Sequence, residues 1–260
     1  MNYEEICDRV RTLARQAGEY IAQQRDGFSF DKVEFKGLHD MVSYVDKETE
    51  KMVVAGLREI VPQAGFITEE GTAGKCGDQE YKWVIDPLDG TTNFVHGLPP
   101  YCVSIALMRE ERVVVGVIYE VTLREMFYAW EGSPAYLNGR PIRVSQVKSV
   151  DKALVAIRFS HSAIANVEQY LDNVAYFQKN SDGIRRTGSA AANIAYVACG
   201  RMDAFSQEKL SPWDVAAGAL IARQAGARVT DFAGGDNYIF GRQITVANPN
   251  LYDEFTSVLK

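Results

Sequence analysis

The chain has 260 residues, 47% of them apolar and 24% charged, which is typical of a globular protein with enough apolar side chains for a sizeable core. Its formal net charge of -6 argues against a broadly basic surface for nucleic acid or an anionic membrane, so an anionic ligand would need local cations. The first residues, MNYEEICDRV, are acidic where a signal peptide would be basic, and no apolar run approaches the roughly 18 residues that span a bilayer, so we expect a cytoplasmic protein.

Helices are predicted at the start of the chain and strands after them. Apolar residues recur at three- and four-residue steps from Ile6 to Ile21, which predicts an amphipathic helix of about five turns. A second helix should run from near Asp46 and stop at Pro62. Short apolar or alternating runs then predict strands at residues 65–68, 81–86, 101–108 and 112–121. The charged tip REER, between the last two runs, predicts a hairpin turn.

The second half alternates between the two kinds of element. It predicts a strand at residues 153–159, a helix near Val167 to Phe177 and a helix after Gly188. The elements expected in the last third are strands at 203–207, 227–232 and 244–248, a helix at 213–226, and a closing helix from about Leu251. Helices layered over two sheets, an α/β fold, are the expected result.

The cysteines and the absence of linkers limit the organisation further. No CxxC pair or His partner at ligand spacing signals a zinc site or a disulfide framework, so we expect reduced thiols at Cys7, Cys76, Cys102 and Cys199. No repeat, low-complexity tract or Pro/Gly/Ser-rich linker interrupts the chain, which argues against domains on a flexible tether.

The segment WVIDPLDGTTNFVHGLP, residues 83–99, carries the most chemical information. We expect Asp86 to end a strand and Asp89 to lie on the following loop, so that both carboxylates converge near the Leu88 carbonyl. Oxygen ligands at this density suit Mg²⁺. Asp-Pro and Asp-Gly are also common turn pairs, so this motif alone could be only a turn.

Two further acidic positions strengthen the hypothesis of a cation site. Glu69 and Glu70 end the strand FIT without a neighbouring basic residue, although paired glutamates on a loop are usually just solvated. Asp214 lies in the first turn of a predicted helix, where the helix dipole alone would favour an acid. Acidic strand ends in this combination are better explained by a bound cation.

Other kinds of catalytic site find no support. The three histidines, His39, His96 and His161, show no metal spacing, and Ser104 lacks the context of a nucleophile elbow, so a covalent hydrolase is not indicated. No GxGxxG follows the first strand, so a Rossmann dinucleotide site is not indicated either.

FITEEG, WVIDPLDGTTNF and PWDVAAGALIARQAGA, in this order and at these separations, resemble motifs of the inositol monophosphatase family, and the resemblance runs from the first helix to about Thr245. It implies the layered αβαβα sandwich shared with fructose-1,6-bisphosphatase. It also implies one domain over residues 1–260, with an N-terminal α+β lobe at about 1–145 and a C-terminal α/β lobe at about 146–260.

The resemblance also implies a magnesium site with two or three ions. One Mg²⁺ would be held by Glu69, Asp86 and the Leu88 carbonyl, and a second by Asp86, Asp89 and Asp214, with Glu70 helping through water.

Catalytic and substrate-binding residues follow from the same resemblance. Asp46 and Thr91 match the pair that, with Glu69, orients the attacking water, although Asp46 could instead be only a helix cap. The implied substrate-binding residues are Gly90, Thr91, Gly188, Ser189, Ala190, Gln207 and Asp214. The small residues after Gly188 could instead mark close helix packing. Gln207 departs from the pattern, because the family usually has a glutamate there.

The implied activity is Mg²⁺-dependent hydrolysis of a small phosphate monoester, with inositol 1-phosphate first because Thr92, Asn93 and Phe94 resemble the inositol monophosphatase version. The alternatives are histidinol-phosphate phosphatase, fructose-1,6-bisphosphatase, 3'-phosphoadenosine 5'-phosphate phosphatase and, as a non-enzyme, an interaction protein on an inherited phosphatase fold. The resemblance further implies a homodimer and inhibition by Li⁺. Neither nucleic acid nor a membrane is expected as a partner.

Overall fold

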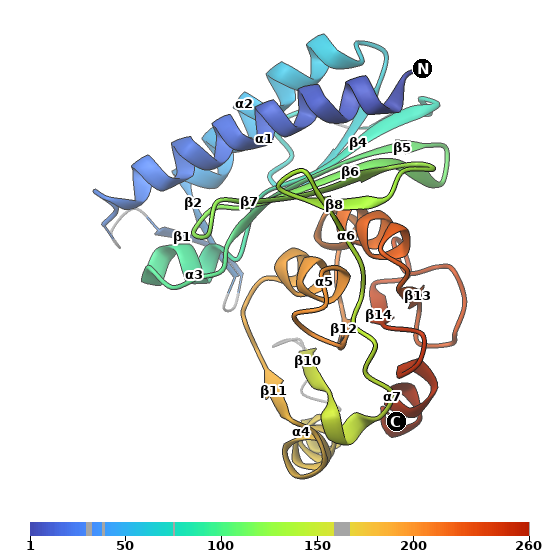
Figure 1. Cartoon of the computed structure of the whole chain (residues 1–260). Helices are drawn as coiled ribbons and strands as arrows, with labels where there is room; N and C mark the ends of the chain where they lie inside the picture. Colours follow the sequence, from blue (N-terminus) through green and yellow to red (C-terminus); the bar gives the residue numbers. More distant parts are fainter. Residues whose placement is uncertain (30–32, 38–39, 75, 159–166, 260) are drawn as a thin grey trace.

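Helices and sheets alternate in layers through the molecule (Figure 1). The computed structural model describes residues 1–29, 33–37, 40–74, 76–158 and 167–259. Within these ranges, no helix combines the length and apolar character needed to cross a bilayer.

The outermost layer consists of α1 (Tyr3–Arg25) and α2 (Tyr44–Ile60), which lie side by side over the larger sheet (Figure 1). α1 begins after Asn2, whose side chain accepts a hydrogen bond from the backbone N–H of Glu5 at 3.3 Å, as an N-cap should. The apolar stripe from Ile6 to Ile21 is buried. The predicted amphipathic helix is therefore confirmed.

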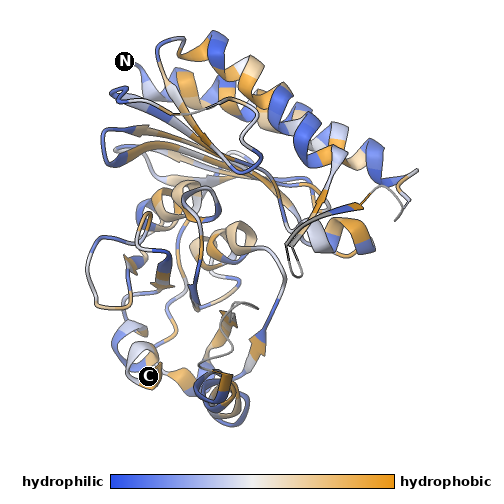
Figure 2. Cartoon of the chain, turned by 180° about the vertical axis from the view of Figure 1, so that it is seen from behind, coloured by the Kyte–Doolittle hydropathy of each residue, from blue (hydrophilic) through white to orange (hydrophobic). Residues whose placement is uncertain are grey.

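The larger sheet has seven strands in the order β3-β4-β5-β6-β7-β8-β9, and its strands are mostly hydrophobic (Figure 2). The strands are β3 (Gly65–Thr68), β4 (Tyr81–Asp89), β5 (Cys102–Arg109), β6 (Arg112–Glu120), β7 (Glu125–Trp130), β8 (Ala135–Leu137) and β9 (Arg140–Ile142). β3 and β4 are parallel, and every later neighbouring pair is antiparallel. The predicted hairpin turn is confirmed, because Arg109 pairs with Arg112 across it.

The smaller sheet has five strands in the order β11-β10-β12-β14-β13. The strands are β10 (Leu154–Arg158), β11 (Gly183–Arg185), β12 (Ala204–Glu208), β13 (Arg228–Thr230) and β14 (Gln243–Ala247). A 3-10 turn at Val150–Lys152 precedes β10. The outer face of this sheet is covered by α4 (Val167–Asn180) and α7 (Tyr252–Val258) (Figure 1).

Between the two sheets lie α5 (Ala190–Ala198) and α6 (Pro212–Gln224), in the core that both sheets share. Small side chains allow close packing in this layer. A Cβ on Gly218 of α6 would stand 2.8 Å from Ile194 of α5, and a Cβ on Gly116 of β6 would stand 2.7 Å from the carbonyl oxygen of Ala217. Such distances leave no room for a methyl group, so Gly218 and Gly116 allow α6 to pack closely against α5 and β6.

The structure corrects the predicted end of one strand and adds elements that the sequence did not predict. β4 continues to Asp89, so Asp89 lies on the strand and not on the following loop. The elements that were not predicted are β1 (Val33–Gly37), β2 (Asp40–Ser43), α3 (Thr91–His96), β7, β8, β9 and β11. All of them are only three to six residues long, too short for a periodic pattern to stand out.

Candidate metal centre

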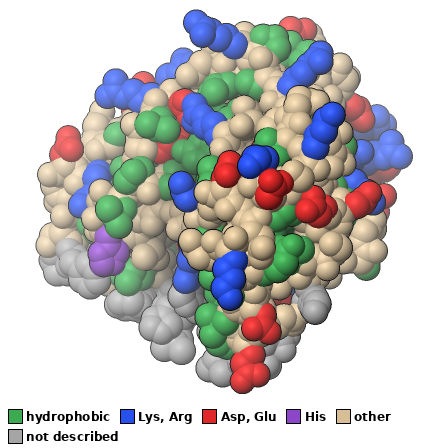
Figure 3. Space-filling model, turned by 60° about the horizontal axis from the view of Figure 1, so that its bottom comes forward, with side chains coloured by type: hydrophobic (Ala, Val, Ile, Leu, Met, Phe, Trp, Pro, Cys, Tyr) green, Lys and Arg blue, Asp and Glu red, His purple; other side chains and the backbone are tan. Residues whose placement is uncertain are grey.

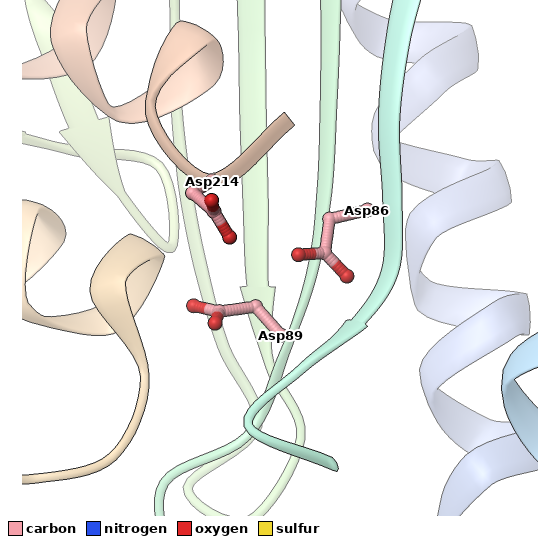
Figure 4. Close-up of side chains that lie close together, drawn as sticks. All are labelled: Asp86, Asp89 and Asp214. Atoms are coloured by element: carbon pink, nitrogen blue, oxygen red, sulfur yellow. The ribbon is translucent and has the colours of Figure 1, made fainter. Parts of the chain in front are cut away.

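Three carboxylates converge between the larger sheet and α6 (Figure 4). Asp86 and Asp89 come from β4, and Asp214 comes from the first turn of α6. One carboxylate oxygen from each residue lies within 4.8 Å of the other two. Asp86 and Asp89 are buried, with 2% and 7% of their surface exposed. The sequence prediction that these residues meet is therefore in agreement with the structure.

A β-bulge brings Asp86 and Asp89 to the same side of β4. Residues three apart on a regular strand point to opposite faces. Here Asp86 pairs with Ser104 and Asp89 pairs with Cys102, so β4 contains one residue more than β5 between these positions. The backbone N–H of Leu88 donates to Oδ1 of Asp86 at 3.0 Å and fixes the bulge.

Asp214 is held by the start of α6. Its Oδ2 accepts a hydrogen bond from the backbone N–H of Ser211 at 2.6 Å, which forms half of a capping box, and Pro212 occupies the first helical turn. The hydroxyl of Ser104 donates to the carbonyl of Trp213 at 3.2 Å and ties β5 to the same helix start. Ser104 is thus buried and hydrogen-bonded within the fold.

The electrostatics of this cluster favour a cation. Burial raises the pKa of Asp86 well above its ordinary range, and the neighbouring charges that add to the shift belong to Glu69, Asp89 and Asp214. Every one of these neighbours is an acid. The side chain of Glu69 lies beside Asp86 and forms a hydrogen bond with it. Carboxylates this close repel one another unless they are protonated or share a cation. An all-oxygen donor set of this kind fits Mg²⁺.

Asp89 is also anchored to α5. Its Oδ2 accepts hydrogen bonds from the hydroxyl of Ser189 and, at 2.7 Å, from the backbone N–H of Ala191. Ser189 in turn accepts from the N–H of Ala192 at 3.1 Å and caps α5. Ser189 is fully buried and Ala190 is 2% exposed. The structure thus shows Ser189 as a partner of Asp89, and its contact with substrate remains a prediction.

Asp46 and Thr91 form the predicted pair. The hydroxyl of Thr91 lies 2.9 Å from Oδ1 of Asp46 and 3.1 Å from the carbonyl oxygen of Leu88, and its single hydrogen can be donated to either. Oδ2 of Asp46 accepts from the N–H and the hydroxyl of Ser43, at 2.8 and 2.7 Å, and so closes the capping box of α2. The N-cap of α2 is therefore Ser43 and not Asp46, which lies in the first helical turn, completes the capping box and contacts Thr91. The part of Asp46 in orienting water remains a prediction. Burial raises the pKa of Asp46.

Gly90 and Gly188 both stand where the backbone takes a left-handed conformation, with φ of 99° and 98°. A Cβ on Gly188 would lie 2.7 Å from the side-chain amide of Asn93. That amide donates to the carbonyl oxygens of Thr187 and Pro100, at 2.7 and 2.8 Å. Asn93 therefore joins the loop before α5 to the DPLDGTTNF segment, and Gly188 is needed for this close approach.

Gln207 lies on a cavity of about 580 Å³ at the smaller sheet, a volume in the range of small-molecule sites. Glu208 and residues of α4 and α7 also line this cavity, whereas Asp86, Asp89 and Asp214 do not. Gln207 is 5% exposed, and its Oε1 has no hydrogen-bond partner among the described residues. Figure 3 shows the molecule with the bottom of the Figure 1 view turned forward, and acidic, basic and hydrophobic side chains are all exposed on this face. The predicted contact of Gln207 with substrate remains a prediction.

The other residues considered in the sequence take no part in the carboxylate cluster. Each of the four cysteines is a free thiol, as predicted. His96 lies exposed in the last turn of α3. His39 and His161 lie outside the residues whose side chains the structure describes.

Comparison with known proteins gives consistent matches along the chain. The model described as the inositol monophosphatase family matches residues 2–259. Over 255 residues the chain is 40% identical to Nus factor SuhB of Escherichia coli (strain K12), with 95% of this chain and 96% of that protein covered. Over 265 residues it is 42% identical to inositol monophosphatase 2 of Solanum lycopersicum, with 98% of each covered.

Solved structures share the architecture as well. The extragenic suppressor protein suhB from Bartonella henselae superposes with a TM-score of 0.92 at 36% identity, over 98% of both chains. The IMPase of Thermotoga maritima superposes with a TM-score of 0.87 at 35% identity, over 97% of this chain and 95% of that chain. These matches confirm the layered α/β fold that the motifs implied.

Proposed function

Because this chain belongs to the inositol monophosphatase family, we propose that it is a Mg²⁺-dependent phosphatase that hydrolyses a small phosphate monoester. The observation that supports this most directly is the convergence of Asp86, Asp89 and Asp214 within 4.8 Å, two of them buried. A structural role alone would not require such mutually repelling acids in one place.

Two groups of ligands are proposed for the metal ions. Glu69, Asp86 and the Leu88 carbonyl would hold one Mg²⁺, and Asp86, Asp89 and Asp214 would hold another. The hydrogen bonds to Oδ2 of Asp89 and Oδ2 of Asp214 orient these side chains in advance. Bound Mg²⁺ would supply neutralisation of the phosphate oxygens and a lower pKa for water.

The residues of the chain would position the reactants. Thr91, whose hydroxyl hydrogen is donated to Asp46 or to the Leu88 carbonyl, would accept a hydrogen bond from the attacking water, and Glu69 would orient the same water in line with phosphorus. The backbone around Gly90 and Thr91 would donate N–H groups to the phosphate. Among the described residues no activated Ser or Cys lies at the cluster. Ser104 and Ser189 are hydrogen-bonded within the fold, and burial raises the pKa of the Cys102 thiol, so direct attack by water is proposed.

Inositol 1-phosphate is the proposed substrate. The Solanum lycopersicum relatives named inositol monophosphatase 2 and 3 are 42% and 39% identical to this chain, and the TTNF segment supports the same choice. Histidinol phosphate, fructose 1,6-bisphosphate and 3'-phosphoadenosine 5'-phosphate are the competing substrates. Gly188, Ser189, Ala190 and Gln207 remain the proposed contacts of the alcohol part.

The test is release of inorganic phosphate from a panel of these monoesters, with Mg²⁺ and with excess chelator. We expect release only with Mg²⁺, and fastest with inositol 1-phosphate. Hydrolysis in excess chelator would refute the metal mechanism. Absence of hydrolysis of every monoester in the panel would refute the proposed function.

A second candidate function rests on the bacterial relatives named Nus factor SuhB, of which the Escherichia coli protein is 40% identical to this chain. We propose that the chain also interacts with transcription factors, beside its phosphatase activity. The measurement is binding of the purified chain to transcription factors of its own organism, compared between wild type and Asp89→Asn. Binding that survives the loss of phosphatase activity would separate the two functions, and absence of binding in the wild type would remove the second.

The family also suggests a homodimer. The chain has a mass of 28.9 kDa, so light scattering should return about twice this value. A monomer mass would contradict the proposal.

A further inference from the structure

Glu50 is a fully buried acid in the middle of α2, with 0% of its surface exposed. Its Oε2 accepts a hydrogen bond from the backbone N–H of Glu70 at 2.7 Å. Its Oε1 accepts from the backbone N–H of Thr72 at 2.7 Å and from the hydroxyl of Thr72 at 2.8 Å. One carboxylate on the helix thus binds the chain at two positions directly after Glu69.

The charge of Glu50 is satisfied by these hydrogen bonds and not by a cation. In the described part of the chain Glu50 forms no ion pair, whereas its exposed neighbour Glu48 pairs with Lys51 at 2.7 Å. A buried carboxylate is costly unless several donors stabilise it, and hydrogen bonds to an ionised acceptor are about twice as strong as neutral ones. Moving residues 70–72 away would leave a buried charge without partners, so this segment is held firmly.

The segment that Glu50 binds carries a proposed metal ligand. Glu69 follows β3, its backbone N–H donates to the carbonyl of Ile85 at 3.3 Å, and its side chain lies beside Asp86. Gly71, between the two positions bound by Glu50, has φ of 69° and open space where a Cβ would be. A glycine in this conformation gives the loop little rigidity of its own. External hydrogen bonds are therefore needed to fix the direction in which the loop leaves β3.

Glu50 lies one helical turn after Asp46, and residues four apart occupy the same face of a helix. Asp46 holds Thr91, and Glu50 holds the segment after Glu69. α2 therefore presents two buried carboxylates to two segments that meet at the carboxylate cluster. Both are placed by one helix, whose start is fixed by the capping box of Ser43.

We propose that Glu50 is a positioning residue for the metal centre: its carboxylate fixes the backbone of residues 70–72 and so keeps the Glu69 side chain against Asp86. The inference rests on the proposed function, in which Glu69 is a ligand of Mg²⁺. Glu50 itself touches neither the metal nor the substrate. Its removal should therefore weaken metal binding more than it changes substrate binding.

The variant Glu50→Gln tests this with little change of shape. An amide offers one acceptor oxygen in place of two, so at least one backbone N–H loses its partner and the charge is lost. We expect the Mg²⁺ concentration for half-maximal rate to rise by about tenfold, the lower end of the effect of residues that orient metal ligands. KM for the phosphate monoester should change by less than about twofold, and calorimetric titration with Mg²⁺ should show the same loss of affinity without turnover.

Two further variants distinguish positioning from charge. Glu50→Asp keeps the charge but is too short to reach residues 70 and 72, so it should behave like Glu50→Gln. Wild-type Mg²⁺ affinity in Glu50→Asp would show that only the charge matters and would overturn the proposal. Thr72→Val removes the hydroxyl donor alone, and it should raise the Mg²⁺ requirement by a smaller factor than Glu50→Gln does.

The matched control is Glu48→Gln, on the same helix but exposed and paired with Lys51, which should leave Mg²⁺ affinity unchanged. If circular dichroism shows that Glu50→Gln does not fold, the Mg²⁺ affinity of Thr72→Val, measured by calorimetry, tests the proposal instead. A weaker affinity than in the wild type would support it, and an unchanged affinity would refute it. A folded Glu50→Gln with wild-type Mg²⁺ affinity would refute the role of Glu50. Failure of the wild type to hydrolyse any monoester would refute the proposed function separately, and the calorimetric comparison would still test the positioning.

Discussion

The hydroxyl of Ser189 donates a hydrogen bond to Oδ2 of Asp89, a residue 100 positions earlier in the chain. The bond joins the start of α5 to the end of β4, and it occupies one oxygen of a proposed metal ligand. The orientation of Asp89 is thus set by a helix from the second half of the chain. This relationship leads to the first expected outcome.

Ser189→Ala should destabilise the protein and weaken metal binding together. The variant removes both the cap of α5 and the hydroxyl donor to Asp89, and loss of a cap costs about 0.5–2 kcal/mol. Thermal unfolding and Mg²⁺ titration measure the two effects. Ser257→Ala, which removes an exposed hydroxyl on α7, is the control. An unchanged Mg²⁺ affinity in Ser189→Ala would show that Ala191 alone orients Asp89.

Asp89→Asn should lower turnover by at least ~100-fold, because it replaces an anionic ligand of the proposed catalytic site by a neutral amide. The measurement is kcat at saturating Mg²⁺. Asp151→Asn is a suitable control, since Asp151 is exposed in the 3-10 turn before β10 and pairs with Lys152. Full activity of Asp89→Asn would contradict the assignment of the carboxylate cluster.

The stability of the metal-free protein should fall as the pH rises above about 4, the ordinary carboxyl pKa. Burial and neighbouring acids raise the pKa of Asp86 in the folded state, so its contribution is present below the unfolded pKa and is lost as pH rises through the folded pKa. Mg²⁺ should therefore raise Tm more at pH 8 than at pH 5, since it binds the ionised cluster.

The comparison for this pH effect is Asp86→Asn, in which both the pH dependence and the response to Mg²⁺ should shrink. Melting curves with Mg²⁺ and with chelator at the two pH values provide the measurement. An equal rise of Tm at both pH values would count against the cluster as the titrating group.

Gln207→Glu should shift selectivity towards inositol 1-phosphate. A carboxylate at this position would accept hydrogen bonds from substrate hydroxyls as a charged group. Hydrogen bonds to a charged group contribute about 1.5–3 kcal/mol, whereas those to a neutral amide contribute about 0.5–1.5 kcal/mol. The ratio of kcat/KM for inositol 1-phosphate to that for a simple alkyl phosphate should rise about tenfold if ~1.4 kcal/mol is gained. An unchanged ratio would mean that Gln207 only lines the cavity at the smaller sheet and does not contact the substrate.

Li⁺ should inhibit the reaction by competing at a Mg²⁺ position, as the family membership suggests. Rates are compared in LiCl and in KCl at equal ionic strength, so that general screening by salt cancels. Identical curves would reject the expectation.

The carboxylate cluster could be predicted from the sequence, but the geometry that assembles it could not. The DPLD motif and Asp214 were identified because acids at the ends of strands and the starts of helices can be recognised from the sequence alone. The bulge that turns Asp86 and Asp89 to one side depends on Ser104 and Cys102 in a different strand, and no local signal marks it.

Glu50 shows a different limit of sequence interpretation. It lies in the charged run DKETEK, which is typical of an exposed helix face. A signal was present, because Val53, Val54 and Leu57 follow Glu50 at steps of three, four and seven and mark the buried stripe. An acid on such a stripe indicates a buried carboxylate with partners elsewhere, but the identity of those partners, Glu70 and Thr72, depends on tertiary structure.

Gly116 influences the distance between the two sides of the metal centre, although it does not contact the carboxylates. Its missing methyl group lets β6 approach the carbonyl oxygen of Ala217 in α6, where a Cβ would be 2.7 Å away. The sheet that contains β6 carries Asp86 and Asp89, and α6 carries Asp214. The close approach of Gly116 to α6 therefore helps to set the distance between the two halves of the site, together with the hydrogen bond from Ser104 to Trp213. A bulkier side chain at position 116 would widen this distance and alter the radius of the ion that the three carboxylates can enclose.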